Sequence, residues 1–315
     1  MGVAAVLPAA ARAQQPVPVI GFLGATAAAN FKPQVEGFLK GLSEAGFIAG
    51  RNVTIEYRWA EDRYERLPGL AAELAARRVD MVMASSPPAA VAAKAAITTM
   101  PVVFVVGTDP ISIGLVESLN RPGGNLTGMY LYISGLVAKK LELLREIAPA
   151  VDRFAVVSNP GTPSEKLDSS EIEAINHAGS GPPVSLFTAS TEAEIDSVFA
   201  ELAARKAAAV IGTDAFYFAH RAHIAEVAAR LRVPAIHYAR EFVIASGLMS
   251  YGANIPQIYR QAAGYAARVL KGEKPSDMPV QQPTTFELAI NLKAAKELGL
   301  NVAPSLLTRA DEVVE

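Results

Sequence analysis

The stretch Val17-Pro-Val-Ile-Gly-Phe-Leu-Gly24 is an apolar strand that leads through the loop Ala25-Thr-Ala-Ala-Ala-Asn30 into a helix opening at Pro33. A similar unit recurs about half the protein further on, where Arg153-Phe-Ala-Val-Val-Ser158 leads through Asn159-Pro-Gly-Thr-Pro-Ser164 into another helix. In open α/β sheets, ligands bind beyond the carboxyl ends of parallel strands, because loop N–H groups and helix N-termini converge there. The repeat therefore predicts two such edges, which form a cleft where they face each other.

Strands and helices alternate along the rest of the chain. Apolar and alternating runs predict further strands at 53–59, 79–83, 101–106, 126–129, 184–187, 208–211, 234–237, 248–251 and 286–290. Helices are expected at 33–46, 64–77, 89–97, 136–147, 164–177, 192–205, 217–231 and 256–270, with a short helical stretch that ends at 119. This order indicates right-handed βαβ units. The expected fold class is α/β, with two doubly wound parallel-sheet lobes joined by a hinge.

Each expected lobe is discontinuous in sequence. Residues 16–125 together with 252–282 are expected to form the first lobe, and residues 126–251 together with 283–315 the second. Short strands near the internal boundaries join the lobes, so few residues need to absorb a rotation between them.

The N-terminal segment resembles the end of a secretory signal. Residues 1–10 are apolar and lead into Ala11-Arg-Ala13, which is similar to a signal-peptidase site. We therefore expect residues 1–13 to be a signal-peptide remnant and the mature chain to begin near Gln14, outside the cytoplasm. The usual positive n-region is missing, and an Ala-rich tail without a targeting role is the alternative.

Composition excludes several classes of protein. With 51% hydrophobic and 19% charged residues, the 315-residue chain has ample material for two buried cores. A net charge of −2 without a basic run argues against a nucleic-acid partner. The absence of cysteine excludes thiol nucleophiles, disulfides and the racemases that use two cysteines. No uncharged apolar run reaches the roughly 18 residues of a membrane span.

Two long stretches resemble a known family. They are Gly107-Thr-Asp-Pro-Ile-Ser-Ile-Gly-Leu-Val-Glu-Ser-Leu-Asn-Arg-Pro-Gly-Gly-Asn-Leu-Thr-Gly128 and Gly272-Glu-Lys-Pro-Ser-Asp-Met-Pro-Val-Gln-Gln-Pro-Thr-Thr-Phe-Glu-Leu-Ala-Ile-Asn-Leu-Lys293, supported by 52–61 and 309–314. They are similar to the ABC-transporter substrate-binding family that includes tryptophan- and tyrosine-type uptake proteins. The resemblance runs colinearly from about Val17 to the C-terminus. It implies a type I periplasmic-binding fold, a periplasmic receptor, and a membrane permease with its ATPase as partners.

The chain departs from that family near the expected cleft. Ser85-Ser86-Pro87-Pro88 stands where the family usually has a glycine-rich turn, and His237 and Ala245 replace an expected tyrosine and glycine. The resemblance therefore transfers the fold more safely than the ligand.

Hydroxyl groups in the first half are candidates for binding an anion. Ser85 and Ser86 follow a strand and precede a helix, so their hydroxyls and the helix N–H groups together suit a carboxylate. Plain helix N-capping is the alternative for both. Thr108, at the end of the neighbouring strand, is a further donor to the same anion. Asp109, which precedes Pro110, is a candidate contact whose alternative role is an Asx-type turn or cap.

Carboxylates in the second half are candidates for binding an ammonium group. Asp214 ends a strand in Gly212-Thr-Asp-Ala215, where it suits a ligand amine across the cleft. Removal of such a partner typically costs about 2–5 kcal/mol. Glu241 is the rival for this role, and either residue has helix capping as its alternative.

Further candidate contacts lie on or beside the same loops. Aromatic rings that suit stacking on a ligand are Phe31, Tyr130, Phe216 and Tyr251, although loop aromatics often only pack. Asn159 and Thr162 are polar candidates in a segment that also has the composition of a turn. His220 and His223 are spaced to share a helix face as metal ligands, but without a third ligand nearby a solvated pair is favoured, and no metal or cofactor is expected.

The sequence favours a receptor that closes two lobes on a small ligand, with an amino acid or similar small carboxylate as first choice. No Gly-x-Ser-x-Gly, phosphate-loop, Gly-x-Gly-x-x-Gly or His-Glu-x-x-His motif is present. Two alternatives remain. One is a ligand-sensing regulator, for which no helix-turn-helix segment precedes Val17; the other is a hydrolase or isomerase, with Asp109 and Asp214 as the candidate acid/base pair.

Overall fold

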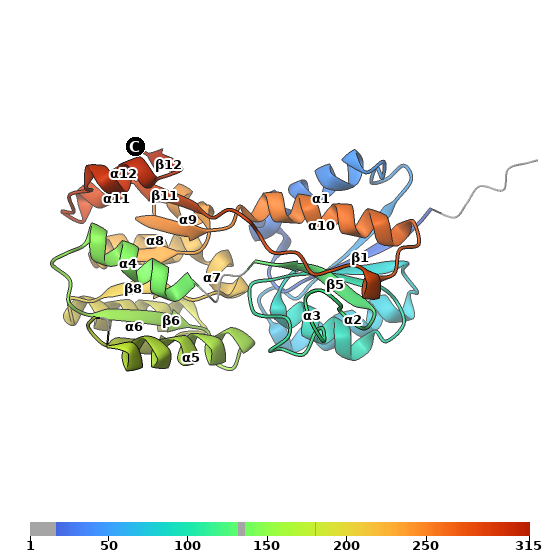
Figure 1. The fold of residues 1–315 in the computed structure, drawn as a ribbon, viewed down its shortest axis with the longest axis horizontal. Helices are drawn as coiled ribbons and strands as arrows, with labels where there is room; N and C mark the ends of the chain where they lie inside the picture. The colour runs from blue at the N-terminus through green and yellow to red at the C-terminus, as the bar shows by residue number, and fades with distance from the viewer. Residues whose placement is uncertain (1–16, 132–135, 180) are drawn as a thin grey trace, which may run out of the picture.

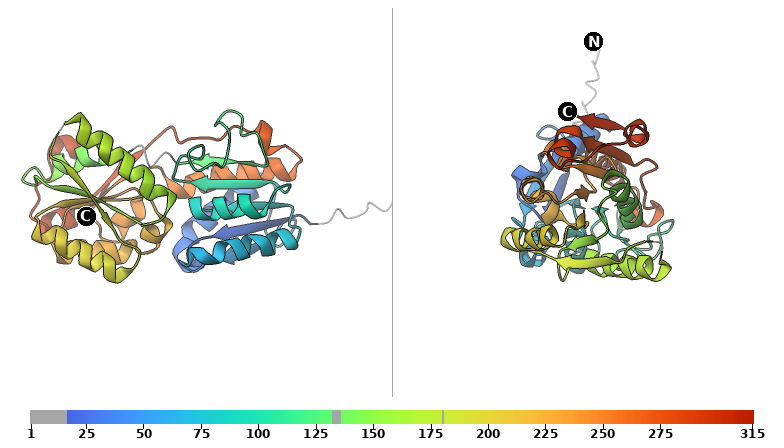
Figure 2. Two further views of the ribbon diagram at one scale, coloured as in Figure 1. Left: turned by 90° about the horizontal axis from the view of Figure 1, so that it is seen from below. Right: turned by 90° about the vertical axis from the view of Figure 1, so that its left-hand side faces the viewer.

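The computed structural model describes residues 17–131, 136–179 and 181–315, which form two α/β lobes lying side by side (Figures 1 and 2). The sequence-based prediction of two parallel-sheet lobes is confirmed. The expected signal-peptide remnant at 1–13 lies outside the described residues. Within the described part of the chain, every helix is too short or too polar to cross a bilayer.

The first lobe is built on a parallel sheet with the strand order β2-β1-β3-β4-β5. Side chains of β1 alternate between its faces: Phe22 packs with the cluster on one side and Leu23 with the cluster on the other. The strands are β1 (Val19–Gly24), β2 (Thr54–Trp59), β3 (Met81–Ala84), β4 (Val102–Val106) and β5 (Leu126–Tyr130). The helices are α1 (Lys32–Glu44) and α10 (Ile255–Leu270) on one face, and α2 (Leu67–Ala76) and α3 (Pro87–Ala96) on the other.

The second lobe repeats this order, since β7-β6-β8-β9-β10 corresponds to β2-β1-β3-β4-β5, and β11 and β12 extend its edge. The strands are β6 (Phe154–Ser158), β7 (Val184–Thr188), β8 (Ala208–Ile211), β9 (Ala235–His237), β10 (Met249–Gly252), β11 (Glu287–Asn291) and β12 (Glu312–Val314). Of these, β11 runs antiparallel to β10. The helices are α4 (Val137–Ile147), α5 (Pro163–Ala178), α6 (Glu192–Ala204), α7 (Ala215–Ala219), α8 (Arg221–Arg230), α9 (Arg240–Ile244), α11 (Leu292–Glu297) and α12 (Pro304–Arg309).

The structure corrects three details of the predicted elements. The helix expected at 217–231 is divided into α7 and α8, because His220 leaves helical geometry with ψ of 17°. Residues 110–119 form turns and bends in place of the expected short helix. Among the α-helices and strands of the described residues, the sequence pattern also missed four short ones, α9, α11, α12 and β12.

The chain passes between the lobes after β5, between β10 and α10, and between η4 (Pro275–Asp277) and β11. Two of these segments pair with each other, since the N–H of Tyr130 donates to the carbonyl of Gln281 at 2.8 Å. The second and third crossing segments are in ring contact, with the centroids of Tyr251 and Phe286 6.0 Å apart. Because β5 pairs with β4, we place the first crossing after Tyr130, a few residues beyond the expected boundary at 125–126.

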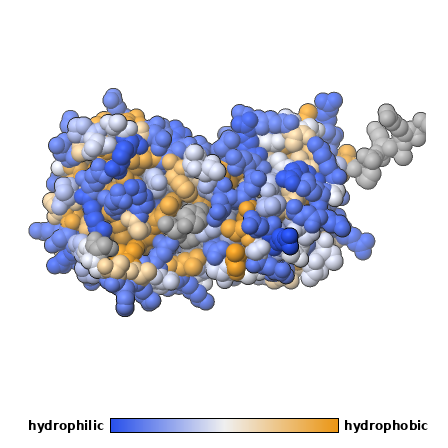
Figure 3. Space-filling view, viewed as in Figure 1, coloured by the Kyte–Doolittle hydropathy of each residue, from blue (hydrophilic) through white to orange (hydrophobic). Residues whose placement is uncertain are grey.

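A segment from the second half of the chain completes the first lobe. Helix α10 lies against α1 (Figure 1), and the two backbones approach closely at glycines of α1. A Cβ atom at Gly37 would lie 2.4 Å from the carbonyl oxygen of Pro256, and one at Gly41 would lie 2.2 Å from that of Arg260. The space-filling view shows hydrophilic residues interspersed with apolar patches over both lobes (Figure 3).

Replacing Gly41 by alanine should therefore weaken the first lobe. Gly41→Ala is expected to lower the free energy of unfolding by about 1–3 kcal/mol, because a backbone carbonyl occupies the space of the new methyl group. Gly264→Ala is the matched control, since Gly264 lies on α10 with open space at its Cβ position. That control should gain about 0.5–1 kcal/mol of helix stability. Urea denaturation followed by circular dichroism measures both, and equal stability of the two variants would contradict the close packing.

Candidate functional site

The strand order of each lobe contains one point at which the chain order reverses. In a doubly wound sheet, ligands bind at the carboxyl ends of strands where the chain order reverses. In the first lobe this point lies between β1 and β3, and in the second between β6 and β8. The loops that follow these strands carry Ser85, Ser86, Asn159 and Asp214. These four of the predicted candidates thus lie at the two switch points.

A cavity with about 450 Å³ of empty space, part of it open to solvent, lies between the lobes. Four of the predicted contact residues line it: Phe31, Ser85, Ser86 and Asp214. Its other walls are mostly apolar and were not expected from the sequence; they are formed by Gln34, Pro87, Val105, Gly107, Leu131, Thr213, Ala215, Phe218, Tyr238, Ile255 and Tyr259.

Asp214 is the buried carboxylate of this cavity, with only 4% of its surface exposed. One oxygen, Oδ1, accepts hydrogen bonds from the Tyr64 hydroxyl at 2.7 Å, from Asn159 Nδ2 at 2.8 Å and from the backbone N–H of Phe216 at 2.9 Å. Within the described residues, no hydrogen bond reaches Oδ2. The carboxylate is therefore held rigidly by one oxygen while the other remains available.

The electrostatics of Asp214 favour a cationic partner. Burial raises the pKa of its carboxyl above the usual range, and the hydrogen bonds from Asn159 and Tyr64 oppose that rise. A cation placed against Oδ2 would compensate the lost solvation of the carboxylate and lower its pKa. The predicted contact Asn159 acts through Asp214 and is not part of the cavity wall.

The two serines are less open to an anion than their position suggested. Pro87 and Pro88 begin α3 and have no N–H groups, and the next N–H, from Ala89, is donated to the Ser86 hydroxyl oxygen at 3.3 Å. The Ser85 hydroxyl donates to the carbonyl of Leu23 at 3.1 Å. Ser86 is thus the N-cap of α3. Its hydroxyl oxygen is used in this cap, whereas its hydroxyl proton is not, and Ser86 belongs to the cavity wall.

Several contacts join the lobes around the cavity. Tyr64 of the first lobe donates to Asp214 and accepts from the N–H of Phe216 at 2.9 Å. The Thr108 hydroxyl lies 3.0 Å from that of Ser164, so this predicted anion donor is engaged with the opposite lobe. Further in, the rings of Phe31 and Phe218 meet edge to face with centroids 6.1 Å apart. The structure thus has its lobes closed together.

Other predicted contact residues lie away from the cavity wall. Asp109 accepts the N–H of Ile111 at 3.0 Å, which is the Asx-type turn given as its alternative. Glu241 lies in the first turn of α9, and burial raises the pKa of its carboxyl. Phe216 packs on Tyr217 and His220, while Tyr130 and Tyr251 lie at the crossing segments. Thr162 caps α5 by accepting the N–H of Glu165.

The two histidines that the sequence disfavours as metal ligands each lie near a carboxylate of α6. Nδ1 of His220 lies 2.8 Å from Glu192, and Nε2 of His223 lies 3.3 Å from Asp196. The described segments bring together no set of three or more His, Cys, Asp or Glu side chains suited to a metal ion. His237, which stands where the resembled family is expected to have tyrosine, is buried. Its ring stacks on the cavity residue Tyr238, with centroids 4.4 Å apart.

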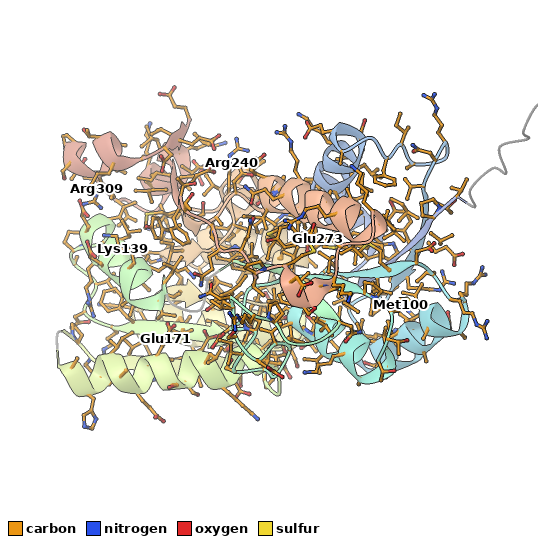
Figure 4. All side chains as sticks on the ribbon, turned by 45° about the vertical axis from the view of Figure 1, so that its right-hand side comes forward. Met100, Lys139, Glu171, Arg240, Glu273 and Arg309 are labelled. Atoms are coloured by element: carbon orange, nitrogen blue, oxygen red, sulfur yellow. The ribbon has the colours of Figure 1, made fainter. Side chains whose placement is uncertain are left out.

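A buried charge cluster lies behind the cavity in the second lobe. Asp168 accepts a hydrogen bond from the Ser158 hydroxyl at 2.6 Å, and the fully buried Lys140 and the half-buried Glu171 are its charged neighbours. Glu171 lies on the side of α5 that faces α4 (Figure 4), and burial raises its pKa to about 7. Burial raises the pKa of Asp168 and lowers that of Lys140. The hydrogen bond between Ser158 and Asp168 links α5 to the end of β6, directly before Asn159.

Sequence comparison finds one family that spans nearly the whole chain. A family model described as ABC transporter substrate binding protein matches residues 20–314. A protein from Clostridioides difficile strain R20291, called tyrosine-binding protein, is 26% identical over 265 residues, which cover 84% of this chain and 76% of that protein.

Solved structures show the same two-lobed arrangement. The ABC domain from Streptococcus pneumoniae in complex with L-Trp has a TM-score of 0.85 and 25% identity, covering 94% of this chain and 99% of that one. The ligand-free, open structure of a substrate binding protein with adhesive properties from Clostridium difficile has a TM-score of 0.68 and 25% identity, covering 95% and 99%. At equal identity and similar coverage, this difference indicates that the lobes here are arranged more like those of the complex.

Loss of the Tyr64 hydroxyl should favour the open arrangement. Tyr64→Phe removes one donor to Asp214 and one acceptor for Phe216, both across the lobes, so we expect a larger radius of gyration by small-angle X-ray scattering. Tyr217→Phe is the control, because the Tyr217 hydroxyl donates to Ala189 within the second lobe. A radius of gyration that is unchanged in Tyr64→Phe would show that this contact does not hold the lobes together.

Proposed function

We propose, from the premise that this chain belongs to the family of ABC transporter substrate binding proteins, that its ligand is an amino acid or a closely related small carboxylate with an ammonium group. The observation that carries the proposal is the Asp214 carboxylate, which is buried in the cavity wall with Oδ1 saturated by three donors and Oδ2 available. A group of this kind binds a primary ammonium well, because the partner supplies the charge and the donors that the cavity lacks.

The walls of the cavity support an aromatic or large apolar side chain on that ligand. Phe31, Phe218, Tyr238 and Tyr259 line the cavity, and the rings of Phe31 and Tyr259 meet edge to face at 5.4 Å. Rings that meet in this way present faces and edges to a further ring. The names of the relatives agree with this chemistry, since one is called tyrosine-binding and another was solved with L-Trp.

Ligand capture in this account is a shift of population towards the closed form. The cavity wall combines groups of both lobes, so a ligand contacts all of them only when the lobes meet. Such a ligand stabilises the closed form by its extra contacts there. The crossing segments, including those at Tyr130 and Tyr251, are the expected hinge.

The partners follow from the family. We infer that a membrane permease and its ATPase receive the ligand from the closed form, and that the protein works outside the cytoplasm, in the periplasm. We also infer that the ligand is released unchanged. Asp109, the expected partner of Asp214 in an acid/base pair, faces a turn away from the cavity wall, which speaks against turnover there.

The proposal predicts a ligand-dependent gain in stability that requires Asp214. L-tyrosine and L-tryptophan should raise the thermal unfolding temperature, and a ligand at about 100 times its Kd adds roughly 2.7 kcal/mol. Asp214→Asn should weaken binding by about 30-fold or more, because a buried charge pair loses one member. Calorimetric titration measures the affinity.

Two controls sharpen this test. Glu241→Gln should bind like the wild type, since Glu241 is absent from the cavity wall. 3-(4-Hydroxyphenyl)propionate, which has the ring and the acid of tyrosine without its amine, should fail to bind the wild type. The proposal is wrong if Asp214→Asn retains full affinity, or if the compound without an amine binds as well as tyrosine.

A further inference from the structure

Gln34 is a fully buried polar side chain of the cavity wall, and the described residues give its amide no hydrogen-bond partner. It lies in the first turn of α1, none of its surface is exposed, and it belongs to the cavity wall. Neither Oε1 nor Nε2 has a hydrogen-bond partner among the described residues. A buried amide that is unpaired at both ends is unusual in a folded protein.

The neighbouring side chains do not account for this position. Leaving a buried donor or acceptor unpaired costs about 1–3 kcal/mol each. The Ser85 hydroxyl donates to the carbonyl of Leu23, the Ser86 hydroxyl oxygen accepts the N–H of Ala89, and neither hydroxyl forms a hydrogen bond with Gln34. Most other members of the wall, such as Phe31 and Ile255, are apolar and offer no side-chain hydrogen bond. The described protein groups therefore supply no partner for the Gln34 amide, and a polar group of a ligand in the cavity is able to supply one.

We propose that Gln34 is a specificity-determining residue of this cavity. It favours ligands whose side chain carries a neutral group that both donates and accepts hydrogen bonds. This inference rests on the proposed function of the same cavity. The amide offers one acceptor and one donor side by side. A hydroxyl or a carboxamide satisfies both, whereas a carboxylate pairs only with Nε2, an ammonium only with Oε1, and a hydrocarbon with neither.

The placement of Gln34 also links this selection to closure. Gln34 belongs to the first lobe and Asp214 to the second, and both face one cavity. A ligand that places its ammonium on Asp214 and its side-chain polar group on Gln34 bridges the lobes. An analogue without the polar group leaves the amide unpaired in the closed form and binds more weakly for that reason.

The test compares two pairs of amino acids that differ in this group, L-tyrosine with L-phenylalanine and L-glutamine with L-methionine. Affinities are measured by calorimetric titration on the wild type and on Gln34→Met, which keeps the side-chain length and removes the hydrogen-bonding atoms. In the wild type we expect the polar member of at least one pair to bind tenfold or more tightly than its apolar counterpart. In Gln34→Met that preference should disappear through weaker binding of the polar member.

A second measurement needs no ligand. Gln34→Met should unfold at the same temperature as the wild type or higher, because it removes an unpaired amide from an apolar wall. Asn176→Leu is the matched control: both ends of the Asn176 amide pair with Val184, at 3.0 and 2.8 Å, so its loss should lower the unfolding temperature.

Each outcome decides between the two proposals. The selection by Gln34 is overturned if the wild type shows no preference within either pair, if the preference persists in Gln34→Met, or if that variant is clearly less stable without ligand. In those cases the loss of binding in Asp214→Asn still supports amino-acid capture. If none of the four amino acids binds the wild type, the amino-acid proposal fails, and the role of Gln34 in selecting a side chain fails with it.

Discussion

The saturation of one oxygen of Asp214 is the constraint on which the site depends. Three donors from three segments meet at Oδ1: the Tyr64 hydroxyl of the opposite lobe, the Asn159 amide beyond β6, and the N–H of Phe216 in α7. These three hydrogen bonds restrain the carboxylate, and Asp214 belongs to the wall of a mostly apolar cavity. The Tyr64 hydroxyl is one of these donors, so it contributes both to the geometry of the binding group and to the contacts that join the lobes.

The fold was predictable because it rests on local periodicity and on topology. Alternation of buried strands with helices fixes the order of elements, and the handedness of βαβ units then leaves few arrangements. The repeat at Val17 and Arg153 correctly indicated two equivalent sheets whose switch points carry Ser85 and Asp214. What the pattern missed were short elements such as α9 and β12, which are too brief for a periodic signal and form through tertiary contacts.

The site was only partly predictable, because its walls come from parts of the chain that are distant in sequence. Tyr259 reaches the cavity from α10, which joins the first lobe only after the chain has built most of the second. Close packing of α10 on Gly37 and Gly41 brings Tyr259 to the cavity, and no local sequence pattern predicts this packing. The anion site expected at Ser85 and Ser86 assumed more free N–H groups at the start of α3 than exist there. Pro87 and Pro88 supply none, and this was visible in the sequence. Gln34 was missed because glutamine is common in the first turn of a helix, and only the structure shows that this one is buried.

The central claim is that an amine-bearing ligand lies between the lobes with its ammonium on the free oxygen of Asp214. A crystal structure of the protein grown with L-tyrosine tests this directly. The account predicts ligand density in the cavity beside the touching rings of Phe31 and Phe218, with the ammonium nitrogen about 3 Å from Oδ2. Density that places the ammonium on another group, with Asp214 left to its three protein donors, would contradict it.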